Sequence, residues 1–152
     1  MKTKFIVILL AVFLVICTVG CKSTPKFSDV TGKEWKLIDV RINNKSISFD
    51  RDVLIEEGFG EIFTLNFDIE RLSGTGAPNR YVAPYTLGKN LEISVKPIAG
   101  TLMAPVRQPE KLKEHDFFTY IQNTYKWNLV NANLELSTKG EDGGEATMVF
   151  KL

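Results

Sequence analysis

The sequence predicts an α+β protein that is mostly β, with an antiparallel sheet and one helix late in the chain. Short segments in which apolar and polar residues alternate recur between turn signals, a pattern that is typical of antiparallel strands. A single segment, at about residues 110–125, instead places its apolar residues at helical spacing. The predicted order is therefore a β-rich first part, one helix and a closing β meander.

The first twenty residues are typical of an export signal. Lys2 and Lys4 precede an apolar run of about fifteen residues, which is shorter than the roughly 20 residues that a membrane-spanning helix requires. The small residue Gly20 then precedes Cys21. We expect a lipoprotein signal peptide over residues 1–20, cleavage after Gly20 and lipid attachment through the sulfur of Cys21.

Two other interpretations of this segment stay open: a plain secretory signal and an uncleaved anchor. Thr18 departs from the leucine that usually stands three residues before a lipidated cysteine. Cys17 is a weaker candidate for lipidation than Cys21 because the branched Ile16 precedes it.

Lipidation would hold the protein at a bacterial membrane outside the cytoplasm. Residues 21–30 include Ser, Thr, Pro and Lys and are predicted to be a tether, which makes residues 31–152 the folded domain. Lys22 is not the acidic residue that retains many lipoproteins in the inner membrane, so the outer membrane is favoured. The expected partners are the membrane, through the lipid anchor, and an unidentified envelope protein.

The composition argues against several function classes. Without Lys2 and Lys4, the exported chain carries 17 basic and 18 acidic side chains, a balance that argues against a nucleic-acid partner. Its only cysteine is Cys21 and its only histidine is His115, so we expect no metal site and no cofactor. Adjacent helical residues do not face each other, which argues against a catalytic pair of His115 and Asp116. A non-enzymatic protein is expected.

Two strands are predicted near the start of the domain. Residues 34–42 alternate, but the alternation slips by one residue between Leu37 and Ile38. This slip predicts a bulge or a strand that changes partners. A turn signal begins at Asn43, after which residues 46–49 are expected to pair back.

The middle of the domain holds three more strand candidates. Residues 62–69 alternate most regularly and should bury one face, made of Phe63, Leu65, Phe67 and Ile69. Residues 71–79 are rich in glycine and are predicted to be a loop. Pro84 lacks an N–H, so the strand at 81–87 should lie at a sheet edge or be bulged. Residues 91–95 are expected to complete a hairpin with it.

The helix and three strands close the chain. Pro109 precedes the predicted helix at 110–125, whose apolar stripe comprises Leu112, Phe117, Phe118, Ile121 and Tyr125. The last strands are expected at residues 127–130, 134–138 and 146–152. Glycines within residues 139–145 predict a hairpin turn between the last two.

One segment resembles a known family. Its residues Gly74, Gly76, Asn79, Arg80 and Tyr81, followed by Tyr85, are similar to the signature loop and strand of the META domain, or HslJ-like, family. Further similarities follow in the family's order: Trp35 near the start, Thr101 and Met103 after Ile98, the late helix and the last hairpin. The resemblance covers about residues 32–152.

This resemblance implies a compact, partly open β-barrel-like sheet with one packed helix. Members of the family are often envelope lipoproteins, loosely linked to secretion, motility or stress, and no catalytic activity is established across them. They resemble small pilot lipoproteins of secretion systems, whose cracked barrel binds an acyl chain or a partner's tail. Ala77-Pro78 and Ala104-Pro105 stand where relatives often carry cysteines, so a redox role does not transfer.

The candidate site residues have a structural and a functional interpretation. The family motif consists mostly of residue types that form turns or pack in a core: its glycines permit unusual backbone angles, and its tyrosines can pack in the core. A structural role is therefore favoured for Gly74, Gly76, Asn79, Arg80, Tyr81, Tyr85, Thr101 and Met103. Arg80 could instead clamp a carboxylate or a phosphate. A set of aromatic side chains could line a cavity for an apolar ligand, or could simply form the core: Trp35, Phe63, Phe67, Phe118 and Trp127.

Two hypotheses of function result. In the first, the protein is a non-enzymatic envelope lipoprotein that acts in protein interaction, in envelope or secretion-related assembly, or in stress. In the alternative, the barrel binds an apolar ligand or an acyl chain. A barrel interior filled by its own side chains would argue against the alternative.

Overall fold

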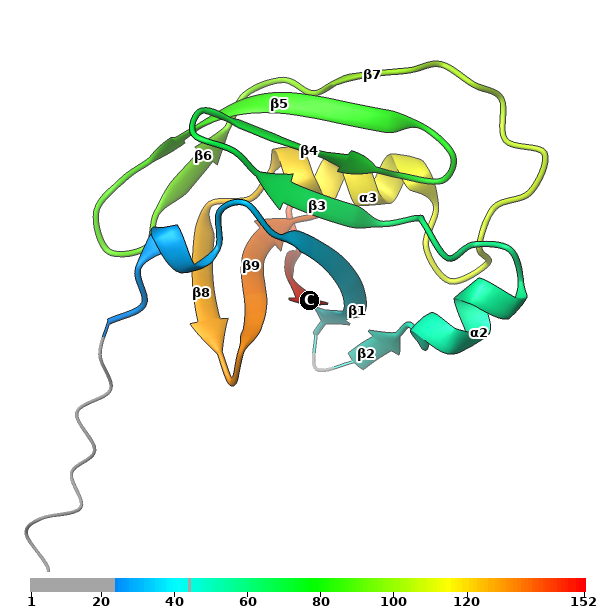
Figure 1. The fold of residues 1–152 in the computed structure, drawn as a ribbon, viewed down its shortest axis with the longest axis horizontal. Coiled ribbons are helices and arrows are strands. Elements are labelled where there is room, and N and C mark those ends of the chain that lie inside the picture. Colours follow the sequence, from blue (N-terminus) through cyan, green and yellow to red (C-terminus); the bar gives the residue numbers. More distant parts are fainter. Residues whose placement is uncertain (1–23, 44) are drawn as a thin grey trace, which may run out of the picture.

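The structure is a computed structural model that describes residues 24–43 and 45–152 (Figure 1). The predicted signal peptide and Cys21 lie outside the described residues. The strands are β1 (Glu34–Ile42), β2 (Lys45–Ser48), β3 (Thr64–Phe67), β4 (Arg71–Thr75), β5 (Arg80–Leu87), β6 (Ile93–Val95), β7 (Ala99–Gly100), β8 (Lys126–Val130), β9 (Asn133–Lys139) and β10 (Glu145–Lys151). The helices are the 3₁₀ turn η2 (Phe27–Asp29), α2 (Arg51–Glu56) and α3 (Glu114–Gln122).

The strands form one antiparallel sheet that curls into a nearly closed barrel. The order is β6-β5-β4-β3-β1-β10-β9-β8, with β2 on β1 and β7 on β5. The two ends of this path meet: Trp127 N–H donates to the Leu91 carbonyl at 2.9 Å, and Ile93 N–H donates to the Tyr125 carbonyl at 3.1 Å. The predicted fold class, mostly β with a barrel-like sheet and one packed helix, is confirmed.

The predicted slip in the first strand is a bulge. The register of β1 on β10 shifts between Leu37 and Asp39. On either side of the shift the inward side chains, Trp35, Leu37 and Val40, are buried. The bulge lets β1 keep an apolar inner face while it exchanges β3 for β2 as its second neighbour.

The β3 to β5 region departs from the sequence expectations in two places. Residues 71–75, predicted to be a loop, form strand β4, which pairs with both β3 and β5. Ile69, predicted to be buried with Phe67, is 87% exposed because the chain turns after β3 and the Asp68 N–H donates to the Arg71 carbonyl. Alternation places Ile69 inward only if the strand continues past Phe67, and β3 ends at Phe67.

Strand β5 has neighbours on both sides, and its own alternation and its register on β4 run unbroken through Pro84. One side pairs with β4, and the other pairs first with β7 and then with β6. The register shifts by one residue between the Val82–Ala99 pair of β7 and the Tyr85–Val95 pair of β6. The extra residue lies in the partner segment, where residues 96–98 face Ala83 and Pro84, so β5 is neither an edge strand nor itself bulged, and both alternatives predicted from Pro84 are wrong.

The helices also differ from expectation. Helix α3 is shorter than predicted: Tyr125, 39% exposed, lies beyond its end, where its N–H already donates to the Ser137 carbonyl of β9. Helix α2 was not predicted. Its start is fixed by the Asp50 carboxylate, which accepts from the amides of Asp52 at 3.0 Å and Val53 at 3.4 Å.

Aromatic rings fill both ends of the barrel. At one end Phe117 of α3 packs against Phe63 and Tyr81. At the other end, four residues further along β3 and β5, Phe27 packs against Phe67 at 5.2 Å and Tyr85 at 5.6 Å between ring centroids. The chain expected to be a tether up to residue 30 is thus already packed on the domain from Phe27 onward.

Candidate functional site

Strand β4 and the loop that follows it each depend on a glycine. A Cβ at Gly74 would collide with the backbone carbonyl of Thr64 in the neighbouring strand. A Cβ at Gly76 would lie 2.6 Å from a Glu114 carboxylate oxygen and 2.8 Å from the Phe118 ring. Both positions therefore require glycine for close packing, in one case against β3 and in the other against α3.

Asn79 joins three segments through its side chain. Its Oδ1 accepts from the Thr101 hydroxyl at 2.8 Å and from the Met103 amide at 2.7 Å. Its Nδ2 donates to the Met103 carbonyl at 3.1 Å and to Glu114 Oε2 at 2.7 Å. Since Asn79 is itself buried, these four bonds satisfy the whole amide and fix the segment after β7 to the β4–β5 loop.

Glu114 completes this network from the first turn of α3. Its carboxylate is buried, and Oε1 accepts from the backbone amides of Ala77 and Asn79, the latter at 2.6 Å. Backbone amides bonded to a carboxylate form strong hydrogen bonds, so Glu114 holds the helix against the loop. We call Asn79, Thr101, Met103 and Glu114 the Asn79 network.

Glu114 was not among the residues predicted to form a site, although its position in the sequence carries a signal. Glu114 stands three residues before Phe117 and seven before Ile121, so all three lie on the buried face of α3. A charged residue within an apolar stripe is seldom tolerated without partners. The Glu114 carboxylate is satisfied by backbone amides of a loop that is distant in the sequence. The spacing of apolar residues cannot predict such partners.

Tyr81 and Tyr85 hold the strands together from inside the barrel. The Tyr81 hydroxyl donates to the Thr64 carbonyl at 2.9 Å, and the Tyr85 hydroxyl donates to the Asp68 carbonyl at 2.6 Å. Burial raises the pKa of Tyr81 well above its ordinary value. Burial, with a smaller contribution from the Asp68 charge, also raises the pKa of Tyr85. Both side chains act as packed cross-links between strands.

The Tyr81→Phe substitution should lower stability by about 1 kcal/mol near neutral pH, because one buried hydrogen bond is lost. The raised pKa also has a consequence at alkaline pH. The phenol stays protonated in the folded state but ionises above about pH 10 once unfolded, so its contribution is present below pH 10 and declines above it. Denaturant titrations between pH 8 and 11 should show a shallower alkaline decline for Tyr81→Phe than for wild type. Parallel declines would contradict this assignment.

Arg80 is the member of the motif whose side chain takes no part in this packing. It is exposed and forms no ion pair among residues 24–43 and 45–152. Its backbone pairs with Thr101: the Arg80 amide donates to the Thr101 hydroxyl at 3.2 Å, and the Arg80 carbonyl accepts from the Thr101 amide at 3.0 Å. The guanidinium is thus available on the outer face of β5.

The aromatic residues proposed to line a cavity occupy different places. Trp35, Phe63, Phe67 and Trp127 are all buried in the core. The Trp35 indole N–H donates to the Val30 carbonyl at 2.9 Å, which fixes that ring in place. Phe118, in contrast, is only partly buried and faces a surface groove. The side chains that could have surrounded an interior ligand therefore pack against one another and against Phe27.

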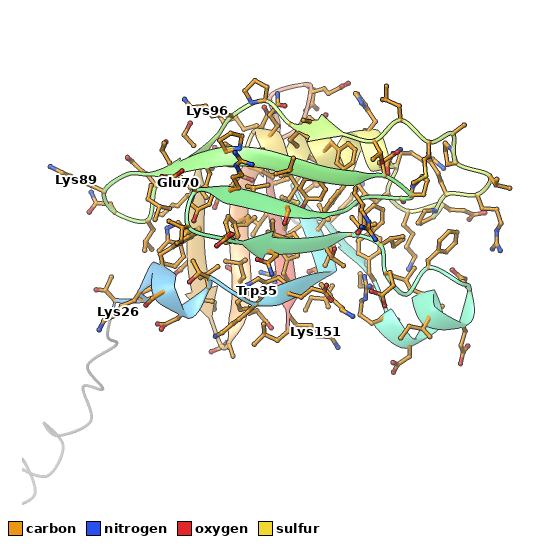
Figure 2. All side chains as sticks on the ribbon, turned by 45° about the horizontal axis from the view of Figure 1, so that its top comes forward. Lys26, Trp35, Glu70, Lys89, Lys96 and Lys151 are labelled. Atoms are coloured by element: carbon orange, nitrogen blue, oxygen red, sulfur yellow. The ribbon has the colours of Figure 1, made fainter. Side chains whose placement is uncertain are left out.

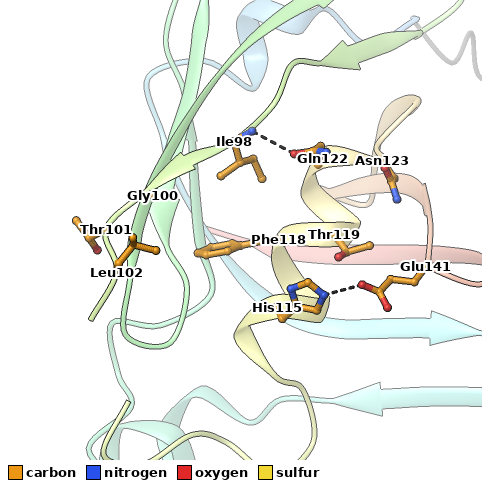
Figure 3. Close-up of a pocket in the computed structure, with 11 residues that line it drawn as sticks. Ile98, Gly100, Thr101, Leu102, His115, Phe118, Thr119, Gln122, Asn123 and Glu141 are labelled. Carbon is orange, nitrogen blue, oxygen red and sulfur yellow. Dashed lines mark hydrogen bonds and ion pairs between the residues drawn. The ribbon is translucent and has the colours of Figure 1, made fainter. Parts of the chain in front are cut away.

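The surface groove lies over α3, between β7 and the β9–β10 turn (Figure 3). It has a volume of about 610 Å³. Figure 3 shows Phe118 pointing from α3 toward β7, while His115 and Glu141 pair across the opposite wall at 2.6 Å. The Ile98 amide of the β7 side donates to the Gln122 side-chain oxygen at 3.1 Å. We call this feature the α3 groove.

The edge of β7 that faces the α3 groove has backbone hydrogen-bonding groups that are not paired within the described sheet. Strand β7 pairs only with β5 in the described sheet. Because the Thr101 amide donates to Arg80, the next pair, Tyr81 with Gly100, is a non-hydrogen-bonded pair. The amide and carbonyl of Gly100 therefore point away from β5. The chain continues into Leu102, which is 99% exposed.

Among residues 24–43 and 45–152, no three His, Cys, Asp or Glu side chains converge as metal ligands would. Over the same residues, none of the helices has both the length and the apolar character needed to cross a membrane.

Comparison with known families identifies the domain. The family model described as META domain matches residues 28–151. The chain belongs to the META domain family. The matched region includes the whole Asn79 network, so the loop through which the sequence resembled the family is the same loop that holds α3 to the META domain barrel.

Two solved structures share the fold of this META domain. An NMR structure of a protein from Burkholderia xenovorans is 17% identical, with a TM-score of 0.54 over 88% of this chain and 93% of that chain. A crystal structure of a DUF4847 family protein from Bacteroides vulgatus ATCC 8482 is 12% identical, with a TM-score of 0.53 over 82% and 95% of the two chains. A comparison with curated proteins found no match.

Proposed function

We propose that this protein is a non-enzymatic lipoprotein of the bacterial envelope whose META domain binds an extended segment of a partner protein in the α3 groove. The observation that carries the proposal is the free edge of β7 beside that groove. A strand that adds to such an edge gains main-chain hydrogen bonds, here to Gly100, while neighbouring pockets select its side chains.

The chemistry of the groove suits a mixed polar and apolar segment. Phe118 and Leu102 offer apolar surface, and Thr119, Gln122 and Asn123 offer side-chain hydrogen bonds. Beyond Leu102, Val106 is also 99% exposed, which extends the apolar surface along the same segment. Exposed apolar side chains grouped beside a groove are typical of protein-interaction sites.

The filled interior counts against the alternative of an acyl-chain carrier. The side chains that would have to line the cavity are packed in the core, and Phe27 and α3 cover its two ends. The lipid anchor rests on the signal-like residues 1–20 and on Cys21. An anchor would place the α3 groove within reach of other envelope proteins.

Photo-crosslinking in cells tests the binding proposal. A photoreactive amino acid at Leu102 should give a discrete protein adduct, and the same residue at Ile55, exposed on α2, should not. Thr119→Arg, which places a long charged side chain in the groove, should abolish the adduct while leaving the unfolding midpoint within a few degrees of wild type. If the yield of adducts at position 102 is no higher than at position 55, the proposal is wrong.

The lipid anchor is tested separately with Cys21→Ser. We expect the wild-type protein to incorporate labelled fatty acid and to sediment with membranes, and the variant to lose both properties. Fatty-acid labelling of the variant would contradict the assignment to Cys21.

A further inference from the structure

The end of the barrel that receives Phe27 carries exposed apolar side chains. Phe27 contacts Tyr85, whose hydroxyl bonds to the carbonyls of Asp68 at 2.6 Å and Ile69 at 3.3 Å. The turn after β3 is therefore held directly beside the point where the chain enters the domain. At the apex of that turn Ile69 is 87% exposed.

Leu87 adds to the same surface from the end of β5. It follows Tyr85 by two residues and therefore lies on the same face of the strand, but it is 46% exposed because it stands past the barrel rim. In Figures 1 and 2 the β5–β6 turn, with Lys89, lies at the same end of the molecule as η2 and Lys26. We call Ile69 and Leu87 the apolar rim.

The position of the chain entry limits how far this end can lie from the anchor. The described chain begins at Thr24, three residues after Cys21, and Phe27 is fixed in the barrel by its contacts with Phe67 and Trp127. At about 3.5 Å per residue, the six residues from Cys21 to Phe27 span about 20 Å at most. A lipid on Cys21 therefore keeps the Phe27 end of the barrel close to the bilayer.

We propose that the apolar rim is a second membrane contact, in which Ile69 and Leu87 enter the interface of the bilayer that holds the lipid anchor. This inference rests on the proposed anchor at Cys21. The charges at this end are mixed: Figure 2 shows Lys26, Lys89 and Glu70 there, and Asp68 lies there through its bond with Tyr85. Apolar insertion rather than attraction to anionic lipids therefore provides the contact. The α3 groove, at the other end of β3 and β5, would then face away from the membrane.

Fluorescent labels on single cysteines test this arrangement. The exported chain has no cysteine besides Cys21, so Ile69→Cys, Leu87→Cys and Leu102→Cys can each carry one environment-sensitive dye. The lipidated full-length variants are reconstituted into phosphatidylcholine vesicles that contain a lipid with a shallow spin-label quencher. Interfacial side chains lie about 5–10 Å into the boundary of headgroups and acyl chains, within reach of that quencher.

We expect a blue shift and strong quenching for the dyes at positions 69 and 87, and neither effect at position 102, which is more open to solvent than either. Dyes at 69 and 87 that behave like the dye at 102, on protein that floats with the vesicles, would overturn the membrane contact alone. Protein that fails to float with the vesicles would overturn the anchor, and the membrane contact with it. Since all three positions are exposed, the labels leave the core intact.

Discussion

Replacing Glu114 by alanine is expected to destabilise the domain by roughly 3–4 kcal/mol, because three buried donors lose their acceptor at once and each unsatisfied buried donor costs about 1–3 kcal/mol. The donors are the amides of Ala77 and Asn79 and the Asn79 side chain. The loss should appear in denaturant unfolding as a lower midpoint. Because α3 would no longer be held to the β4–β5 loop, the α3 end of the barrel should also exchange its amide hydrogens faster.

Two further variants make this prediction specific. Glu114→Gln keeps the acceptor for the two backbone amides but turns an N–H toward Asn79 Nδ2, so it should cost less than alanine. Asp116→Ala removes an exposed acid from the same first helical turn and should cost at most about 1 kcal/mol. If Asp116→Ala were as damaging as Glu114→Ala, helix electrostatics rather than the Asn79 network would explain the loss.

The second large effect is expected at Phe67. Phe67→Ala removes a fully buried ring that contacts both Phe27 and Tyr85, and such truncations cost about 3–5 kcal/mol. The matched control is Ile69→Ala, two residues along the chain. It should change stability by at most about 0.5 kcal/mol because the side chain is already in solvent.

This pair of variants also distinguishes the prediction made from the structure from the prediction made from sequence alternation. Alternation alone places Phe67 and Ile69 on one buried face, so it predicts a loss for both substitutions. The turn that follows β3 predicts a loss for Phe67→Ala only. Two comparable losses in thermal or denaturant unfolding would contradict the described end of β3.

Features set by local alternation could be predicted from the sequence. The bulge in β1, the return of β2 and the last hairpin all follow from a change in periodicity or from a turn signal in the sequence. Each of these depends on neighbours in the chain. The family resemblance added the barrel-like closure, which the contacts between Leu91 and Trp127 and between Tyr125 and Ile93 confirm.

Features set by distant partners could not be predicted in this way. The glycines of 71–76 suggested a loop, whereas Gly74 is needed because β3 passes too close for a side chain. The role of Glu114 depends on amides 35 and 37 residues away in the sequence. Phe27 looked like part of a tether because the rings that receive it belong to β3, β5 and β8.

The family motif therefore describes architecture more than chemistry. The polar groups of Asn79, Tyr81 and Tyr85 form hydrogen bonds with other parts of the fold, whereas the neighbouring Arg80 is exposed. With the interior occupied, the two surfaces that we propose for binding lie outside the barrel: the α3 groove at one end and the apolar rim at the other. We infer that the domain works through its outer surface.

Native mass spectrometry of the protein, purified from cells in mild detergent, tests this claim most directly. The account predicts a single species whose mass equals the polypeptide plus its covalent modifications. An acyl chain or other apolar molecule retained non-covalently at near one-to-one ratio, and released only on unfolding, would show that the barrel interior binds a ligand and would contradict the account.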